Sequence, residues 1–475
     1  PGVTVMIKGT NLGTSSNNQG IFNLKVPQNL KNLTLIFSFI GMESKEVKIG
    51  THLKLRIILK EKKQDLDEVV ITGYANINKN SFTGNSVMVT REELLKVSKT
   101  NVIQALQVFD PSFRIQENNE MGSDPNSLPE VYIRGRSGIG VKELDKNSLN
   151  KSALENNPNL PTFIMDGFEI SVQKLYDLDP NRIESITILK DAAATAMYGS
   201  RAANGVVVIT TIAPRPGQVQ ISYNLTGTLT IPDLTDYNLM NAEEKLQAEL
   251  LSGLYDLSTA NGMTAYVMKK NYITKGVDTD WMSQPLQNQF NHSHSLYVSG
   301  GTEGFRFGAD LSYSHEGGVM KDSYRNRMSV GVYVDYRVGK LQIRNHVSYD
   351  LAKSSDSPYG SFSDYTKQQP YYAIHDEDGK LKQTLATGIP NPLYEATLGN
   401  FSRGESTNLT NNLSFYWFIS DHLQLQSQFS VTKSDTEDNN FTDPLSTKYS
   451  SQDNPFTRGD LSVSSTDNFS WNVNA

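Results

Sequence analysis

The side chains best suited to chemistry in this sequence are a few histidines and acidic clusters. His292 and His294 are two residues apart, so in a strand both would lie on one face and could hold a metal ion. No third ligand follows nearby, which favours a structural position. If the strand belongs to a β-barrel, the two histidines would either line its lumen or lie in the aromatic girdle at its rim. The run HDEDGK at 375–380 has the acidic spacing of a calcium loop without the rest of that motif, which favours a hairpin turn. We therefore expect no metal ion and no other cofactor.

A covalent nucleophile is equally hard to find. The sequence contains no cysteine, and Ser137 follows the pattern Gly-x-Ser-Gly instead of the Gly-x-Ser-x-Gly of a nucleophile elbow. No Ser, His and Asp grouping can be assembled, and there is no Walker motif for a nucleotide. An enzyme is therefore the poorest fit to these residues.

Aromatic side chains crowd one long polar segment, residues 354–405. Their faces could stack on sugar rings or on peptide side chains, or the loop could pack on itself. The candidates for ligand contact are Tyr359, Phe362, Tyr365, Tyr371 and Tyr372.

Composition limits the classes further. A chain of 475 residues is long enough for two or three domains. A net charge of −7 with no cluster of Lys and Arg argues against a nucleic-acid partner. The longest apolar run, residues 33–42, is half of what a membrane helix needs, so a membrane crossing would require a closed β-barrel.

The second half of the sequence has the period of barrel strands. From Gln218 onward, apolar residues such as Val219, Ile221 and Tyr223 alternate with Gln, Ser, Asn and Thr, which predicts apolar side chains outside and polar ones inside. About eight such segments lie near 218–231, 293–300, 305–314, 327–338, 341–352, 407–419, 422–433 and 460–474.

The lengths of the connections between these segments predict an orientation. GTEG, Gly339 with Lys340, and residues 420–422 are short turns, as expected on the periplasmic side, whereas the other connections are long loops, as expected outside. The first long loop, 232–291, carries a predicted helix, NAEEKLQAELLSGLYD, with Leu246, Leu250 and Leu254 on one face.

The densest signal is the stretch Leu178–Thr211. Asp179 and Pro180 predict a capped helical turn, and residues 185–189 predict a strand. Asp191 can cap a short helix that ends at Gly199, after which Gly205 opens the apolar strand VVVITT. The expected result is a compact βαβ-like unit. Upstream, Thr90 with Glu93 predicts a capping box, Asn101 caps the helix NVIQALQVF, and PEVYIRGRSGI at 129–139 reads as a strand with glycine turn points.

The run ESITILKDAAATAMYGSRAANGVVVITT, preceded by FIMDGFEI at 163–170, resembles the plug-domain signature of SusC/RagA-type TonB-dependent outer-membrane transporters. The resemblance implies a plug domain over 76–213 and the first part of a transmembrane β-barrel over 214–475. The signature positions are Arg134, Gly135, Asp166, Gly167, Asp179, Pro180, Glu184, Lys190, Asp191, Tyr198, Gly199, Asn204 and Gly205. Arg134 and Arg136 could bind ligand, but buried ion pairing between plug and barrel is favoured.

The segment before the plug has two parts. Residues 1–60 read as short strands and resemble a carboxypeptidase-regulatory-like β-sandwich without its first strand, so we expect a processed or truncated N-terminus. Residues 61–75 form a linker with DLDEVVITGY, an extended segment with no local partner that could add to another protein's sheet edge. It resembles the TonB box, although an ordinary edge strand would look alike; its place ahead of the plug signature favours the TonB box. The residues are Asp67, Glu68, Val69, Val70, Ile71 and Thr72.

The expected fold class is therefore mainly β: a partial outer-membrane β-barrel, an α/β plug domain and an N-terminal β-sandwich. Eight strands cannot enclose a plug of this size, and plugged transporters have about 22 strands, so we expect the first part of a longer protein. The resemblance implies TonB-driven import of oligosaccharides or oligopeptides across the outer membrane of a Gram-negative, Bacteroidetes-like bacterium, with contacts to lipid and to a SusD-like lipoprotein. The alternative is a receptor that signals ligand occupancy to a regulator without transport.

Overall fold

The computed structural model describes residues 2–8, 10, 12–17, 19–24, 34–39, 44–48, 55–59, 69–71, 76–78, 86–99, 102–116, 124–127, 130–133, 160–190, 198, 202, 204–386, 388–420 and 423–474. The chain separates into two compact units, Pro1–Val69 with Asn78–Asn80, and Val70–Ile77 with Ser81–Ala475. The larger unit contains the plug domain and the predicted barrel strands.

The N-terminal unit is an antiparallel sheet with one apolar face. Its strands are β1 (Thr4–Ile7), β2 (Gly13–Ser15), β3 (Thr34–Ser38) and β4 (Lys45–Lys48), in the order β2-β1-β3-β4. Alternate residues Val5, Ile7, Leu35 and Phe37 form the buried core. Apolar residues of the segments 21–24 and 55–59 pack against this core without joining the sheet, although the sequence predicted strands there.

The plug domain has a five-stranded sheet in the order β11-β10-β13-β12-β7. The strands are β7 (Ser86–Thr90), β10 (Thr162–Met165), β11 (Phe168–Ile170), β12 (Ile183–Leu189) and β13 (Val206–Thr211). β10 runs parallel to β13, whereas β12 pairs antiparallel with β13. The prediction of a βαβ-like unit was therefore wrong, because the two signature strands lie side by side as antiparallel neighbours and β10 supplies the parallel partner.

Short helices cover the apolar side of this sheet. They are α1 (Arg91–Val97), α2 (Val102–Phe109), α4 (Val172–Asp177) and the 3-10 turn η3 (Pro180–Arg182). The predicted capping box of α1 is present, since Thr90 accepts from the Glu93 amide and Glu93 accepts from the Thr90 amide. Leu94, Leu106 and Leu175 from three of these helices are fully buried with Ile186 and Ile209 of the sheet. Two small ladders complete the domain, β5 (Val69–Ile71) with β6 (Asn76–Asn78) and β8 (Phe113–Gln116) with β9 (Glu130–Ile133).

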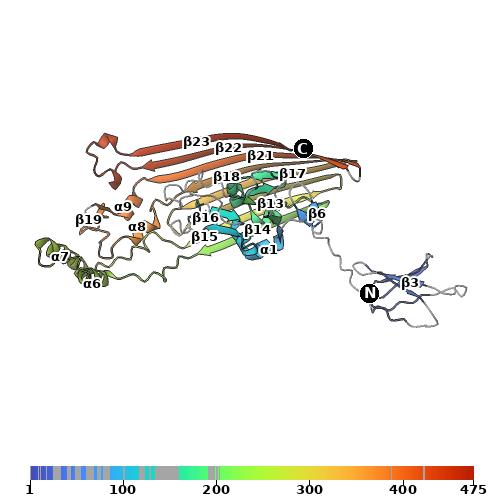
Figure 1. The fold of residues 1–475 in the computed structure, drawn as a ribbon, viewed down its shortest axis with the longest axis horizontal. Coiled ribbons are helices and arrows are strands. Elements are labelled where there is room, and N and C mark those ends of the chain that lie inside the picture. Colours follow the sequence, from blue (N-terminus) through green and yellow to red (C-terminus); the bar gives the residue numbers. More distant parts are fainter. Residues whose placement is uncertain are drawn as a thin grey trace. The chain divides into compact units, whose positions relative to one another are not determined.

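The eight predicted barrel segments form one antiparallel sheet in sequence order, here called the wall. Figure 1 shows its long strands side by side, from β14 in green to β23 in red. The strands are β14 (Gly217–Thr230), β15 (Gln289–Gly301), β16 (Phe305–Gly317), β17 (Tyr324–Val338), β18 (Leu341–Ser355), β21 (Phe401–Ser420), β22 (Leu423–Thr442) and β23 (Asp460–Asn474). Large apolar side chains such as Ile221, Leu409 and Trp471 are exposed on one face. The opposite face is polar, which confirms the predicted alternation and the partial barrel.

Short turns join the strands at one end of the wall, at 302–304 and 339–340, and at this end β21 stops at Ser420 and β22 starts at Leu423. At the other end the connections are 231–288, 318–323, 356–400 and 443–459. The connection between β16 and β17 is shorter than predicted because both strands extend into the segment that was assigned to a loop.

The long connections contain their own small elements. These are α6 (Ala242–Leu251), α7 (Ala260–Thr274), α8 (Phe362–Thr366), β19 (Thr384–Ala386), β20 (Ile389–Pro390), α9 (Pro392–Thr397), η5 (Thr447–Tyr449) and η6 (Pro455–Thr457). The predicted helix is α6, with Leu246 buried, but the helix ends before Leu254, whose side chain is exposed. Among the described residues, no helix is long and apolar enough to cross a membrane.

Candidate functional site

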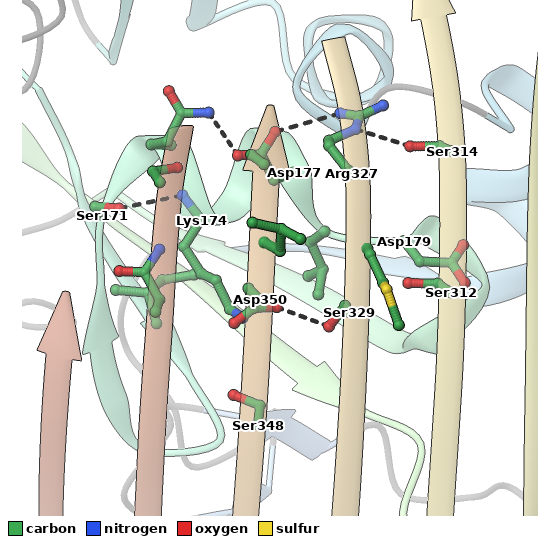
Figure 2. A pocket seen from close by; sticks show the side chains of 18 of the residues that line it. Ser171, Lys174, Asp177, Asp179, Ser312, Ser314, Arg327, Ser329, Ser348 and Asp350 are labelled. Carbon is green, nitrogen blue, oxygen red and sulfur yellow. Dashed lines mark hydrogen bonds and ion pairs between the residues drawn. The ribbon is translucent and has the colours of Figure 1, made fainter. Parts of the chain in front are cut away.

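The plug meets the polar face of the wall through α4 and the turn that follows it. Ser171 caps α4 by accepting a hydrogen bond from the Lys174 amide, which fixes where the helix begins. Leu175 and Tyr176 point into the plug core. Lys174 and Asp177, three residues apart, project towards the wall, as Figure 2 shows.

The Asp177 carboxylate is held by two arginines of β17. Arg325 donates twice, from Nε to Oδ1 at 3.0 Å and from Nη2 to Oδ2 at 2.8 Å, a bidentate geometry. Arg327 Nη1 lies 3.4 Å from Oδ1 and 3.2 Å from the Tyr176 carbonyl oxygen, while its Nη2 lies 2.8 Å from Glu316 Oε2 of β16. Arg325 is only 2% exposed, so this pair is shielded from water.

This environment controls the ionisation of Asp177. Burial disfavours the charged carboxylate, but the positive charges of Arg325 and Arg327 and the Arg325 hydrogen bonds outweigh it. The pKa of Asp177 is therefore held below its ordinary value. The carboxylate stays charged and paired at neutral pH.

Two further ion pairs join the same plug segment to neighbouring strands. Lys174 pairs with Asp350 of β18, which also accepts a hydrogen bond from Ser329 Oγ at 2.7 Å. Arg182 Nη2 lies 3.1 Å from Asp310 Oδ1 of β16, and its guanidinium stacks 4.0 Å from the centre of the Tyr297 ring. Segment 174–182 is thus fastened to three adjacent strands.

The inward face of the wall divides into two sectors of different chemistry. The charged sector is the inward face of β16, β17 and β18, where Asp310, Glu316, Arg325, Arg327, Asp335, Arg344 and Asp350 lie. The uncharged sector is the inward face of β21, β22 and β23 apart from Asp438 of β22, a carboxylate that also lines a cavity between the plug and the wall. At its even-numbered positions 406–412, 430–436 and 464–470 every residue is Ser, Thr or Asn.

A cavity of about 680 Å³ lies between the plug and the wall. Its floor includes Phe168, Lys174 and Asp177 of the plug, and its sides include Thr228 of β14 and the uncharged sector. A second, much smaller cavity of about 40 Å³ lies under it, between Leu178 of the plug and Ser348 of β18. Charged side chains, among them Glu316, Arg327, Asp350 and Asp438, line other parts of the larger cavity. Hydroxyl and amide groups can both donate and accept hydrogen bonds, so the side of this cavity formed by the uncharged sector suits a polar, uncharged ligand.

The plug-signature residues that the structure describes mostly fix the plug fold. Asp166 and Gly167 form the β10–β11 turn with φ of 51° and 91°, and the Asp166 carboxylate accepts from the Thr211 amide and hydroxyl. A Cβ atom at Gly167 would lie 2.5 Å from Gln428 Nε2 of β22, so this turn needs glycine because of its conformation and its close contact with the wall.

Asp179 caps η3 and Pro180 is its first residue, as predicted. Lys190 Nζ lies 2.8 Å from Asp110 Oδ1, next to hydrogen bonds from Ser112. Burial alone would raise the pKa of Asp110, but Lys190 and Ser112 together lower it. The pair ties the end of β12 to the end of α2.

The remaining signature residues have weaker roles or lie outside the description. Glu184 makes an exposed pair with Arg215 at 3.5 Å, Asn204 donates to the Leu160 carbonyl at 3.4 Å, and Gly205 has φ of 94°. Tyr198 packs against a small second apolar cluster of the plug, which consists of Ile164, Leu189, Ala202, Val206 and Val208. The positions outside the described residues are Arg134, Gly135, Arg136, Ser137, Asp191 and Gly199, as is the predicted cap Asn101.

The predicted TonB box is only partly described. Val69–Ile71 forms β5, which pairs with β6, so the expectation that this segment has no local partner was wrong. Asp67, Glu68 and Thr72 lie outside the described residues.

The loop aromatics divide into buried and half-buried groups. Tyr365 and Tyr371 are almost fully buried, and the Tyr371 hydroxyl donates to Glu249 of α6 at 2.9 Å. Tyr372 packs edge-on against Tyr371, Phe362 against Tyr237, and Lys321 lies over the Tyr359 ring. The loops therefore pack on one another through most of these rings, which is the self-packing alternative.

The histidines and the acidic loop follow the structural alternatives. His292 and His294 share a strand face with Phe290, and Tyr223 Oη lies 2.7 Å from His294 Nδ1, as in an aromatic girdle. His315 of β16 is near His292, yet within the described part of the chain no three His, Asp or Glu side chains are placed to hold a metal ion. HDEDGK forms a hairpin turn with Gly379 at positive φ, and the Asp376 amide donates a hydrogen bond to the Lys380 carbonyl oxygen.

Sequence reasoning missed the residues that fasten the plug, Lys174, Asp177 and Arg182, together with their partners in the wall. A signal was present in the sequence. Arg325 and Arg327 occupy inward positions of β17, and the residues that follow them along this strand, 328–334, are mostly small or apolar. Ion pairing between plug and wall was expected, but it was assigned to Arg134 and Arg136.

Comparison with known families assigns both parts before the wall. Residues 1–71 match the family described as CarboxypepD_reg-like domain, and residues 78–206 match the TonB-dependent Receptor Plug Domain. The chain is 30% identical to TonB-dependent receptor SusC of Bacteroides thetaiotaomicron over 344 residues, 70% of this chain and 30% of that protein. It is 26% identical to TonB-dependent receptor P3 of Formosa agariphila, over 92% of this chain and 41% of that protein.

Solved structures show the same fold. The RagAB peptide importer in its open-open state superposes with a TM-score of 0.63 at 20% identity, over 79% of this chain and 43% of that chain. The closed-closed state gives 0.62 at 21% identity, over 82% and 45%. The chain spans less than half the length of these relatives.

A plug domain fastened to the polar face of an antiparallel barrel wall defines the class of TonB-dependent receptors. Within that class, the N-terminal regulatory-like domain, the SusC relative and the RagAB fold place this chain in the SusC/RagA type. The relatives are named as TonB-dependent receptors and a peptide importer, and none of these names describes an enzyme.

Proposed function

We propose that this chain is part of a TonB-dependent importer that carries oligomeric nutrients, glycans or oligopeptides, across the outer membrane. The named relatives support this reading, since one is the receptor SusC and another the RagAB peptide importer. The same comparison supports a Gram-negative, Bacteroidetes-like host, and we propose a SusD-like lipoprotein as the partner at the outer face. The short turns and the N-terminal domain face the periplasm, and the long loops face outward.

The observation that carries the proposal is the fastened plug. Asp177, Lys174 and Arg182 hold the plug against the inward face of the wall through buried or partly buried ion pairs. A solute that passes inside the wall requires some of the plug to move. Moving it requires work, because separating a buried pair leaves uncompensated charge.

The segment around Val69–Ile71 is the proposed site at which TonB binds and exerts force on the plug. Its short pairing with β6 leaves few backbone hydrogen bonds to lose when another protein's sheet edge replaces it. TonB would bind here, main chain to main chain, and pull towards the inner membrane. No nucleotide site is needed in the barrel protein itself.

Deletion of residues 65–72 tests the proposal. Uptake should be abolished, whereas insertion into the outer membrane and ligand binding at the cell surface should be unchanged. The sharper pair is Val70→Pro against Val70→Ala, because proline removes an amide hydrogen that a strand ladder needs and alanine does not. Growth on supplied oligosaccharides or peptides gives the readout, and growth that survives the deletion contradicts TonB coupling.

A further inference from the structure

Within the eight wall strands of this chain, the described ion pairs to the plug are concentrated in one sector. The ion pairs that join described plug residues to described wall residues end on Asp310, Arg325, Arg327 and Asp350, all in the charged sector. They leave from one segment of nine residues, 174–182. A pull that reaches the plug through its N-terminal strands therefore meets its strongest resistance at this side of the wall.

The contact with the uncharged sector is of another kind. There the turn at Gly167 touches the side chain of Gln428 on β22, and Gln428 Oε1 has no hydrogen-bond partner. Both residues of this contact are uncharged, so no opposite charges have to be separated when the plug moves away from β22. Among the described contacts, the uncharged sector is thus the side from which the plug is released more easily.

The uncharged sector also has a regular arrangement of hydrogen-bonding groups. Thr410, Thr432 and Ser470 stand directly opposite one another on β21, β22 and β23. The next two inward rows in one direction repeat the pattern, first with Asn408, Ser434 and Asn468 and then with Ser406, Thr436 and Thr466. Rows of this kind are about 7 Å apart along a strand, and strands are about 4.8 Å apart. An uncharged chain with hydroxyl or amide groups can break its hydrogen bonds to the side chains of one row and form equivalent hydrogen bonds to the next row.

A charged cargo group has no counter-ion on these rows, where desolvation would cost free energy without compensation. In the charged sector, in contrast, Asp310, Arg325, Arg327 and Asp350 are paired with the plug. Glu316, Asp335 and Arg344 are paired with other residues of the wall. The hydrogen-bonding rows belong to strands other than those to which segment 174–182 is fastened. Both observations therefore favour the uncharged sector as the path for cargo.

On the basis of the proposed import function, we propose that segment 174–182 stays fastened to the charged sector during transport. Cargo then passes along the uncharged sector, which accepts an uncharged, hydrogen-bonding chain. Such a chain is a neutral oligosaccharide or an uncharged stretch of peptide.

The route can be tested with two matched threonines that both line the large cavity, Thr432 of β22 and Thr228 of β14. This stretch has no native cysteine, so Thr432→Cys and Thr228→Cys introduce unique thiols into it. The variants are made in the full-length protein in cells and labelled with a biotin maleimide. Labelling at Thr432 should lower uptake about tenfold or more and labelling at Thr228 less than about twofold, because only the first label narrows the proposed path. Equal inhibition, or greater inhibition at Thr228, overturns the route.

The probes in this test are a hydrolysate of neutral plant glycans, a tryptic digest of casein and a hydrolysate of polyuronate. Uptake of the glycan or the peptide preparation identifies the source of the chain, and selective uptake of the polyuronate overturns the assigned chemistry. If the unlabelled protein imports none of the three, the import function itself fails, which is a different result from a wrong route.

A cross-link tests the fastened side. Leu178 and Ser348 line the same small cavity but take no part in the ion pairs, so Leu178→Cys with Ser348→Cys can be joined by a short bis-maleimide. Uptake should stay within about twofold of the double variant before cross-linking, because this part of the plug need not leave the wall. A loss of about tenfold on cross-linking overturns the proposal. If the double variant does not assemble, Leu178→Cys with Ser312→Cys provides the second pair at this cavity.

Discussion

The charged and uncharged sectors of the wall have the same backbone and different inward faces. In both, consecutive strands pair antiparallel over about fifteen or more residues, and apolar side chains alternate outward. The charged sector places carboxylates and guanidinium groups against the plug. The uncharged sector places only hydroxyls and amides towards the cavity at the even-numbered positions 406–412, 430–436 and 464–470, with Asp438 beyond them. The comparison shows that the hydrogen-bonded ladder supplies the wall, so the inward side chains are free to specialise in holding the plug or in leaving a surface open.

The largest effect should come from removing one partner of the buried pair in the charged sector. Asp177→Ala leaves Arg325 buried without its carboxylate, and losses of about 3–5 kcal/mol are typical of such changes. Protease digestion of the plug in outer-membrane vesicles should show faster cleavage than in the wild type. Thr432→Ala in the uncharged sector is the matched control and should not change cleavage.

A companion variant separates lost attraction from uncompensated charge. Asp177→Ala combined with Arg325→Met removes both charges and should recover much of the protection, since an apolar replacement of a buried pair is often close to neutral. If the double variant is cleaved as fast as the single one, the pair matters for geometry more than for charge. Wild-type cleavage in Asp177→Ala alone would show that the plug is held elsewhere.

Acid should weaken the charged sector alone, and only at low pH. The pKa of Asp177 is lowered in the folded protein, so its contribution is complete above the unfolded value, about 3.9, and is lost as the pH falls through the lower folded value. Plug protection should thus stay constant from neutral pH to about 4 and decline below it. Asp177→Asn should remove this part of the pH dependence, and a decline between pH 7 and 5 would point to a different group.

The smallest effect is expected at the border between the sectors. Lys353 of β18 and Glu405 of β21 form a pair at 3.0 Å, but their side chains are 53% and 51% exposed. Exposed pairs contribute about 0–1 kcal/mol. Lys353→Ala should therefore leave the thermal unfolding midpoint in detergent nearly unchanged, and a large shift would mean that this border holds the two sectors together.

Local rules predicted much of this fold because their causes are local. Thr90 with Glu93, Asp179 with Pro180, and the alternation after Gln218 each depend on residues within one turn or one strand. The helix α7 was missed because ANGMTAYVMKKNYIT has no apolar stripe, and Leu254 was misplaced because α6 ends early. These errors reflect tertiary contacts of the loops that overrule local preference.

The fastening residues could not be paired from sequence. Asp177 and Arg325 are 148 residues apart and Lys174 and Asp350 are 176 apart, so no periodic pattern connects them. The chemistry was anticipated in kind, as ion pairing between plug and barrel, but not in position. The antiparallel pairing of β12 with β13 escaped prediction for the same reason, since strand direction is set by which neighbour each strand finds.

The short link between plug and wall has a geometric consequence. Only residues 212–216 separate β13 from β14, and Ile212 is held by a hydrogen bond from its amide to the Arg182 carbonyl. Six Cα-to-Cα steps at full stretch span about 20 Å. The link between the plug sheet and the first wall strand is thus shorter than a bilayer is thick. Complete expulsion of the plug would require β14 to separate from β15.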